Sequence, residues 1–142
     1  MQLTRHTDYA FRALIYLASM PNSTATIGTI SETFGIPKSH LMKVISSLSA
    51  HGYVISTRGK SGGISLLKSA EEITLREIVM LMEKTLVPFD CIGQNCLILN
   101  SCRLNRAFLE AQKKYLESLE SYTIADMLNN ETIITIHGKA SV

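Results

Sequence analysis

Two short amphipathic segments joined by a tight turn limit the folds open to this chain. The first spans residues 27–34, in which Thr29 and Glu32 have the spacing of a capping box. Gly35 suits the exit of that helix, and Pro37 suits the first turn of the next one. The second segment repeats apolar residues at helical spacing: Leu41, Val44, Ile45 and Leu48. Together the segments predict a helix-turn-helix whose second helix is the recognition helix.

A hairpin pattern follows directly. Residues 53–57 and 64–67 predict two short strands around a glycine-rich turn. A helix-turn-helix with such a hairpin is a winged helix, so we expect double-stranded DNA as the partner. The glycines let the turn approach a phosphate backbone, and its cations attract that backbone. The hairpin residues that we expect to contact DNA are Arg58, Gly59, Lys60, Ser61, Gly62 and Gly63. On the recognition helix they are Lys38, Ser39, His40 and Lys43.

Three further helices are predicted around this module. One spans residues 8–20, and Thr74 and Glu77 form a capping box that opens another, which runs to about residue 83. A long helix over residues 102–119 begins after Asn100 or Ser101 as its cap. Its apolar residues follow the steps of a coiled-coil seam: Leu104, Phe108, Ala111, Tyr115 and Leu119. We expect this helix to pack against a second copy in a homodimer.

The predicted fold is therefore mainly α with a small β wing: a winged helix-turn-helix followed by a long C-terminal dimerisation helix. We divide the chain into a DNA-binding domain over residues 1–70 and a region of cysteines and dimerisation helices over 71–128. A last short helix is expected over residues 121–128. The remainder, 129–142, is expected to be a disordered tail or a loose strand.

Composition narrows the class of protein. The 142 residues are 46% hydrophobic and 18% charged, as in a globular domain. The polar opening does not have the form of a signal peptide, and no apolar run reaches the roughly 18 residues of a membrane span. We therefore expect a cytoplasmic protein that does not enter the membrane. Residues 1–70 carry seven Lys and Arg against two Asp and Glu, whereas the remainder carries seven against ten, which favours a polyanion as the partner of the first half.

All three cysteines, Cys91, Cys96 and Cys102, fall within one short segment. Their thiolates can converge on one soft metal centre, one ligand short of a tetrahedral zinc site or a Cys₄ cluster. The residues alone leave open an iron–sulfur cluster, a structural zinc ion with a fourth ligand from elsewhere, and three idle thiols. The spacings disfavour zinc, whose paired cysteines are usually separated by about two to four residues. An odd number of cysteines also argues against a disulfide framework.

Four stretches of the sequence resemble a known family. The opening LTRHTDYAFRALIYLA, the wing RGKSGGISL, the segment ITLREIV and the Cys91-x4-Cys96-x5-Cys102 spacing are similar to the NsrR-type nitric-oxide-sensing repressors. These belong to a bacterial winged-helix family that also includes the iron–sulfur regulator IscR. The resemblance covers about residues 1–128. It implies a homodimer that holds an iron–sulfur cluster at the cysteines, of the 4Fe-4S rather than the 2Fe-2S type.

The resemblance also bears on the fourth ligand. In the IscR branch a histidine lies three residues after the third cysteine, where this chain has Asn105. In the NsrR-type branch the implied ligand is an aspartate at the start of the first helix, supplied by the dimer partner, and the matching residue is Asp8. Asp8 equally fits a carboxylate that stabilises a helix N-terminus and pairs with Arg12 one turn later.

The function implied is transcriptional repression that nitric oxide relieves, at a pseudo-palindromic operator read by the dimer. The alternative within the same family is a regulator that senses iron or cluster supply. A DNA-binding module stapled by zinc is a third hypothesis. An enzyme is not expected, because the sequence has no nucleophile–base pair, no phosphate-binding loop and no C-x-x-C motif.

Overall fold

Six α-helices and one two-stranded hairpin make up the chain in a computed structural model that describes residues 2–138. The α-helices are α1 (Arg5–Ala18), α2 (Ile27–Phe34), α3 (Lys38–Ala50), α4 (Leu75–Met82), α5 (Arg103–Glu120) and α6 (Asn130–Gly138). The strands are β1 (Val54–Thr57) and β2 (Gly63–Leu66), and two 3-10 turns are η1 (Ala70–Glu72) and η2 (Ala125–Met127). The prediction of a mainly α fold with a β wing is confirmed.

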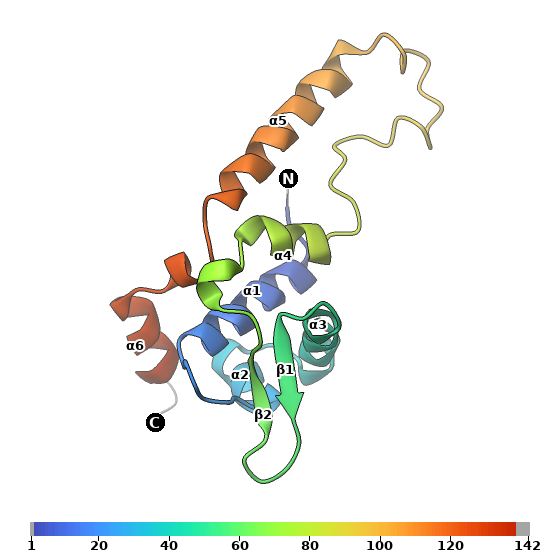
Figure 1. Cartoon of the computed structure of the whole chain (residues 1–142). Helices are drawn as coiled ribbons and strands as arrows, with labels where there is room; N and C mark the ends of the chain where they lie inside the picture. Colours follow the sequence, from blue (N-terminus) through green and yellow to red (C-terminus); the bar gives the residue numbers. More distant parts are fainter. Residues whose placement is uncertain (1, 139–142) are drawn as a thin grey trace.

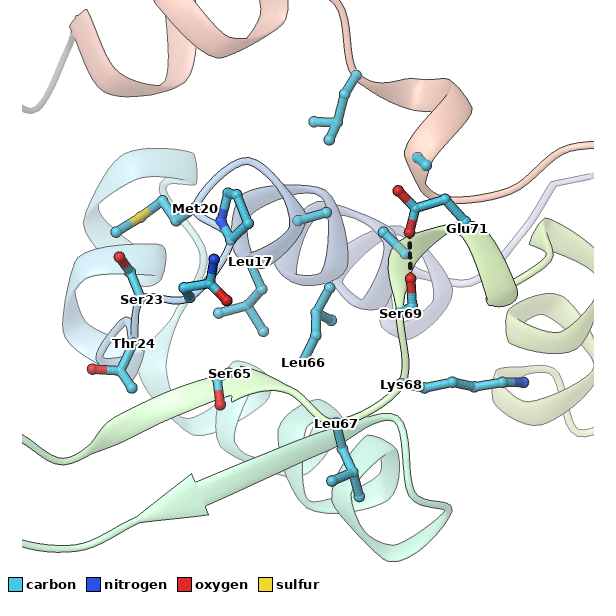
Figure 2. Close-up of a pocket in the computed structure, with 16 residues that line it drawn as sticks. Leu17, Met20, Ser23, Thr24, Ser65, Leu66, Leu67, Lys68, Ser69 and Glu71 are labelled. Carbon is cyan, nitrogen blue, oxygen red and sulfur yellow. Dashed lines mark hydrogen bonds between the residues drawn. The ribbon is translucent and has the colours of Figure 1, made fainter.

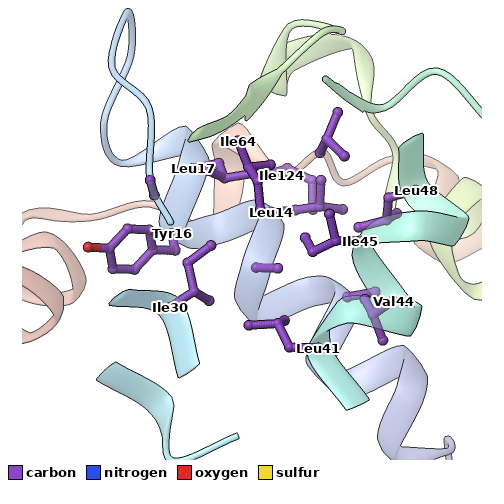
Figure 3. Packing of buried hydrophobic residues seen from close by; sticks show 14 of the residues in the cluster. Leu14, Tyr16, Leu17, Ile30, Leu41, Val44, Ile45, Leu48, Ile64 and Ile124 are labelled. Atoms are coloured by element: carbon purple, nitrogen blue, oxygen red, sulfur yellow. The ribbon is translucent and has the colours of Figure 1, made fainter. Parts of the chain in front are cut away.

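Helix α1 lies at the centre of the N-terminal half (Figure 1). Thr4 caps its first turn, so the helix begins three residues before the predicted start at Asp8. Its buried face packs against the apolar face of α3, where the four predicted residues are all buried (Figure 3). The residues at the centre of this core are Ala10, Ala13, Leu14, Leu17, Leu41, Val44, Ile45 and Leu48. Because α1 and α3 share one close-packed core, a movement of α1 also displaces α3, the recognition helix.

The sequence predicted the end of α2 correctly, but the starts of α2 and α3 differ from the prediction. Gly35 ends α2 in the left-handed conformation with φ of 65°, which a side chain would strain. The predicted cap at Thr29 is wrong, because the N-cap is Thr26, whose hydroxyl accepts a hydrogen bond from the Thr29 N–H at 3.0 Å. Pro37 is the residue just before α3 rather than within its first turn.

The wing is an antiparallel hairpin in which Val54 pairs with Leu66 and Thr57 with Gly63. Its base is anchored to the loop before α2, because Ala25 exchanges two backbone hydrogen bonds with Ile64, of 2.9 and 2.7 Å. Ile64 is also buried in the core shared by α1 and α3. The hairpin therefore has a fixed base and an exposed tip.

Helices α4 and α5 carry the C-terminal half. The predicted capping box is confirmed: Thr74 accepts from the Glu77 N–H, and Glu77 accepts from the Thr74 N–H. Helix α4 packs against α1 and against α5, and α5 then projects away from the winged helix (Figure 1). No residue of α5 is buried in its own chain. The three cysteines lie in the irregular segment between α4 and α5, at the far end of the molecule from the wing (Figure 1).

The C-terminal residues differ from the prediction. A short helix was expected over 121–128, and the structure has only the 3-10 turn η2 there. The expected disordered tail or loose strand is wrong for residues 130–138, which form α6. Ile136 is buried, and the His137 imidazole lies 2.9 Å from the Ser19 hydroxyl, so α6 packs on the C-terminal end of α1. Residues 139–142 of the predicted tail lie outside the described residues.

Candidate DNA interface and cysteine site

Helix α3 separates its two faces cleanly. The four apolar residues described above are buried, while Lys38, Ser39, His40 and Lys43 are all exposed. The His40 ring lies 6.3 Å from the rings of His6 and Tyr9 on α1. The exposed face is therefore polar and cationic, as a helix that enters the major groove requires, and α1 contributes aromatic rings at its edge.

The tip of the wing is exposed at Arg58, Gly59, Lys60 and Ser61. Gly59 has φ of +111°, so the turn needs a glycine there. A Cβ at Gly62 would lie 2.8 Å from the carbonyl carbon of Arg58. A Cβ at Gly63 would lie 2.8 Å from the Thr24 Cβ. The sequence suggested that the glycines admit a phosphate backbone, and the structure adds that the hairpin itself needs three of them.

The three cysteines line one cavity of about 310 Å³ at the end of α5. The other lining residues are Pro88, Phe89, Asp90, Gln94, Ile98, Leu104 and Asn105. Asp90 shapes the segment, because its carboxylate accepts the Gly93 N–H at 2.8 Å. The fold therefore brings Cys91, Cys96 and Cys102 to one small space lined by both apolar and polar side chains.

The thiols of this cavity influence one another. Partial burial, together with the neighbouring Cys96 and Cys102, raises the pKa of the Cys91 thiol. A metal centre that binds here must therefore displace a proton from Cys91. Cys102 is the N-cap of α5, and its sulfur accepts the Asn105 N–H at 3.3 Å. The cap expected at Asn100 or Ser101 is one or two residues too early.

The donor set suits a soft centre. Three thiols around a shared cavity are the ligand type of zinc and of iron–sulfur clusters. Within residues 2–138, no three Cys, His, Asp or Glu side chains converge closely enough for a single metal ion. The donor types therefore suit a soft metal centre held at this cavity.

Asp8 lies apart from the cysteines of its own chain. It is in the first turn of α1, and its Oδ1 accepts from the Arg12 Nε at 2.9 Å, which confirms the predicted ion pair. The Arg12 guanidinium also lies 6.0 Å from the centre of the Phe34 ring. Among the described residues, those that line the cysteine cavity do not include Asp8. Asp8 and the cysteine cavity are therefore separate sites within one subunit.

A larger cavity of about 610 Å³ lies between the C-terminal end of α1, β2 and η1 (Figure 2). Its wall includes Leu17, Met20, Ser65 and Lys68, and the Ser69 hydroxyl donates to the Glu71 carboxylate at its edge. None of the predicted site residues lines it. The predicted site residues therefore lie on the first turn of α1, on α3, on the wing and in the cysteine segment.

Comparison with known proteins places the chain. Residues 3–130 match the model of the Rrf2 family, described as iron-dependent transcriptional regulators. The chain belongs to the Rrf2 family. Rrf2 members are DNA-binding transcriptional regulators that act as dimers, not enzymes. Helix α6 lies almost entirely beyond the matched residues.

Solved Rrf2-type structures share the fold. CymR of B. subtilis, called the global cysteine regulator of that organism, is 22% identical, and the match covers 89% of this chain and 95% of CymR with a TM-score of 0.75. IscR of T. potens is 23% identical over 89% of this chain and 85% of IscR, with a TM-score of 0.70. The oxidized form of S. aureus CymR is 20% identical over 89% and 95%, with a TM-score of 0.70. At these identities the similarity shows the fold alone.

Two features of this Rrf2 chain escaped the sequence analysis. Asp90 and Gln94 line the cysteine cavity, and their positions beside Cys91 were the available signal. Glu83 accepts hydrogen bonds from α1, for which the sequence holds no signal. Within the described residues, no helix is both long and apolar enough to span a membrane.

Proposed function

We propose that this chain is a homodimeric repressor that holds an iron–sulfur cluster at Cys91, Cys96 and Cys102 and responds to nitric oxide. The observation that carries the proposal is the meeting of all three cysteines at one cavity in an Rrf2-family chain. A 4Fe-4S cluster is the form that the NsrR-type resemblance implies. When bound, such a cluster supplies iron sites that react with small diatomic ligands such as nitric oxide.

The residues around the thiols favour the NsrR-type branch over the IscR branch. Asn105 occupies the position of the IscR-type histidine and lines the cavity, yet its amide is a poor ligand for iron. Among the described residues, no histidine lines the cavity. Asp8 of the partner subunit is then the candidate for the fourth ligand, and a carboxylate is a harder, weaker ligand for iron than a thiolate. One corner of the site would be held more loosely than the other three.

Asp8 lies on the helix that can pass a signal to DNA. Its turn of α1 precedes the residues that pack against α3, and His6 and Tyr9 flank it next to His40. Release of Asp8 would free this turn, and α3 would follow because the two helices share a core. A coupling of about 2.7 kcal/mol would weaken operator binding roughly hundredfold, within the usual range for allostery.

The operator is expected to be pseudo-palindromic, because a two-fold dimer presents two α3 helices and two wings to one face of the duplex. Lys38, Ser39, His40 and Lys43 would contact base edges and phosphates in the major groove. The wing residues, Arg58 to Gly63, would reach the minor groove or its phosphates and contribute affinity more than base identity. Such a repressor acts on cytoplasmic DNA.

Purification without oxygen tests this function. We expect a coloured protein whose visible absorbance bleaches with nitric oxide and whose operator affinity falls in parallel. The Asp8→Ala variant should keep its fold and its thiol-held cluster but show an altered response to nitric oxide. Glu72→Ala, which removes another exposed carboxylate, is the matched control. A colourless protein that binds its operator at full strength would refute the proposal.

One observation favours a second candidate. The family model is described as iron-dependent, so a regulator that senses iron or cluster supply fits the same site. In that case operator affinity should change when the cells are depleted of iron and stay constant when nitric oxide is added. A colourless protein that contains zinc would instead support a structural staple.

A further inference from the structure

Glu83 connects the cysteine segment to the winged helix. It is the residue that follows α4 and opens the irregular stretch that leads to Cys91. Its Oε1 accepts three hydrogen bonds from the first turn of α1: from the Thr4 N–H at 2.7 Å, from the Thr4 hydroxyl at 3.0 Å and from the Thr7 hydroxyl at 2.5 Å. One carboxylate oxygen therefore links the start of the cysteine segment to the N-terminal end of α1.

The chemistry of this contact is favourable. A helix N-terminus has unpaired N–H groups and a positive partial charge, so a carboxylate there is stabilised. Thr7 is fully buried, and if Glu83 moved away its hydroxyl would lose its short hydrogen bond and keep only the Thr4 hydroxyl, 3.2 Å away, as a partner. Burial raises the pKa of Glu83, but the hydrogen bonds from Thr7 and Thr4 outweigh it and hold the pKa below its ordinary value. The carboxylate is therefore ionised at neutral pH.

The same turn of α1 faces the recognition helix. His6 and Tyr9 flank Thr7 in sequence, and both rings lie 6.3 Å from the His40 ring on α3. Asp8 lies in this turn as well. Residues 4–9 therefore hold the contact with Glu83, the proposed ligand and the contact with the recognition helix within two helical turns.

We propose that Glu83 is a positioning residue: it ties the root of the cysteine segment to the first turn of α1, so that a change in the segment shifts α3 within the same subunit. This inference deepens the proposed function, on which it rests for the identity of the signal. It differs from the role of Asp8, because Glu83 acts inside one chain and Asp8 would act across the dimer.

Two isosteric variants test the contact from its two sides. Glu83→Gln keeps the shape of the side chain and removes its charge, and Thr7→Val removes the buried hydroxyl. Glu120→Gln is the matched control, because Glu120 is an exposed carboxylate paired with Arg76 on α4. Operator affinity is measured by fluorescence anisotropy on cluster-loaded and cluster-free protein, and hydrogen exchange is followed over residues 4–10.

We expect Glu83→Gln and Thr7→Val each to reduce the ratio of cluster-loaded to cluster-free operator affinity by about tenfold, a change of roughly 1.4 kcal/mol. Hydrogen exchange in the first turn of α1 should rise in both variants even without a cluster. The double variant should be no worse than Glu83→Gln alone, because the hydrogen bond that Thr7→Val removes is one of those that Glu83 accepts. Glu120→Gln should leave ratio and exchange unchanged.

Additive effects, or an unchanged affinity ratio and unchanged exchange in Thr7→Val, would overturn the inference. If Glu83→Gln loses its cluster, Thr7→Val still tests the contact between Glu83 and α1. That variant leaves the Glu83 carboxylate and every proposed cluster ligand in place. The proposed function fails separately: wild-type protein would then show no cluster or no response to nitric oxide. In that event, raised exchange and weaker operator binding in both variants would still support the contact.

Discussion

The sulfur of Cys102 accepts a hydrogen bond from the backbone N–H of Asn105 at 3.3 Å, so a proposed cluster ligand is also the N-cap of α5. Thiols are rarely strong caps, whereas serine is among the preferred N-cap residues. The two roles of Cys102 can therefore be separated by substitution.

Cys102→Ser should retain the cap and lose the soft ligand. We expect its α5 to be at least as stable as in the wild type, while the iron content after purification without oxygen falls sharply. Cys102→Ala should lose both, and it should be less stable than Cys102→Ser by about 0.5–2 kcal/mol, the range for replacing a hydroxyl cap by alanine. Circular dichroism with urea unfolding of the cluster-free proteins measures the cap, and iron analysis measures the ligand. Equal helix stability in the Ser and Ala variants would contradict the capping role.

The wing should contribute affinity that depends on salt rather than on sequence. Arg58→Ala and Lys60→Ala should each weaken binding to specific and unrelated duplexes alike and lower the salt slope by about 1. Titrations at several salt concentrations measure both quantities. Lys113→Ala is the control, because Lys113 is an exposed cation on α5, paired with Glu117 and remote from the wing. A loss confined to one base position would place these residues in direct readout instead.

The ion pair between Lys68 and Glu77 predicts an acid-dependent loss of stability. Burial raises the pKa of Glu77, but the hydrogen bonds from Lys68 and the Thr74 N–H outweigh it, so the folded-state pKa lies below its ordinary value. The stabilisation is therefore present above the unfolded-state pKa and is lost as the pH falls through the lowered folded-state value. Both side chains are about one-third exposed, so its size should be only about 0.5 kcal/mol.

Glu77→Gln tests this dependence, because glutamine retains the capping interaction with Thr74 and removes the charge. Urea unfolding should show wild type more stable than the variant at about pH 7 and the two equal at about pH 3. A difference that stays constant over this range would mean that the charge of Glu77 contributes nothing. At the alkaline end the sign is opposite: the hydrogen bond to Glu77 raises the pKa of Lys68, so its contribution disappears only above that raised value.

Helix α6 should stabilise the winged helix through one side chain. Ile136 is 5% exposed, whereas Ile134 on the same helix is 70% exposed. Ile136→Ala should therefore cost about 2 kcal/mol of unfolding free energy, and Ile134→Ala less than about 0.5 kcal/mol. Thermal or urea unfolding compares the two. Equal losses would show that α6 does not pack on α1 in solution.

Capping patterns show where sequence reasoning succeeds and where it fails. Thr74 and Glu77 predicted the start of α4 correctly, because both groups lie within one helical turn. At α2, Thr26 and Thr29 are three residues apart and either can act as a cap. The structure selects Thr26, with the Thr29 hydroxyl 2.8 Å from it. The choice depends on the preceding loop, which Ala25 fixes to the wing through Ile64.

Long-range contacts explain what the sequence could not predict. Ile133, Ile134 and Ile136 are β-branched and follow no clean helical stripe, so α6 has little local signal. Its partner on α1 lies more than a hundred positions earlier: Ser19 and His137 are 118 residues apart. Likewise, Glu83 and Thr7 are separated by 76 residues. The cysteines were easier to group, because they are close in the sequence, and the structure brings all three to one cavity.

Because α5 is largely exposed in a single subunit, the concentration of the protein becomes part of how it is regulated. No residue of α5 is fully buried within its own subunit, although the helix packs against α4, so a second copy of the chain must supply much of its stabilisation. A cell with few copies of the protein would contain mostly monomers. Each monomer has one α3 and one wing, and so makes only half of the DNA contacts of a dimer. Occupancy of the promoter would then rise steeply with copy number, before any signal molecule arrives.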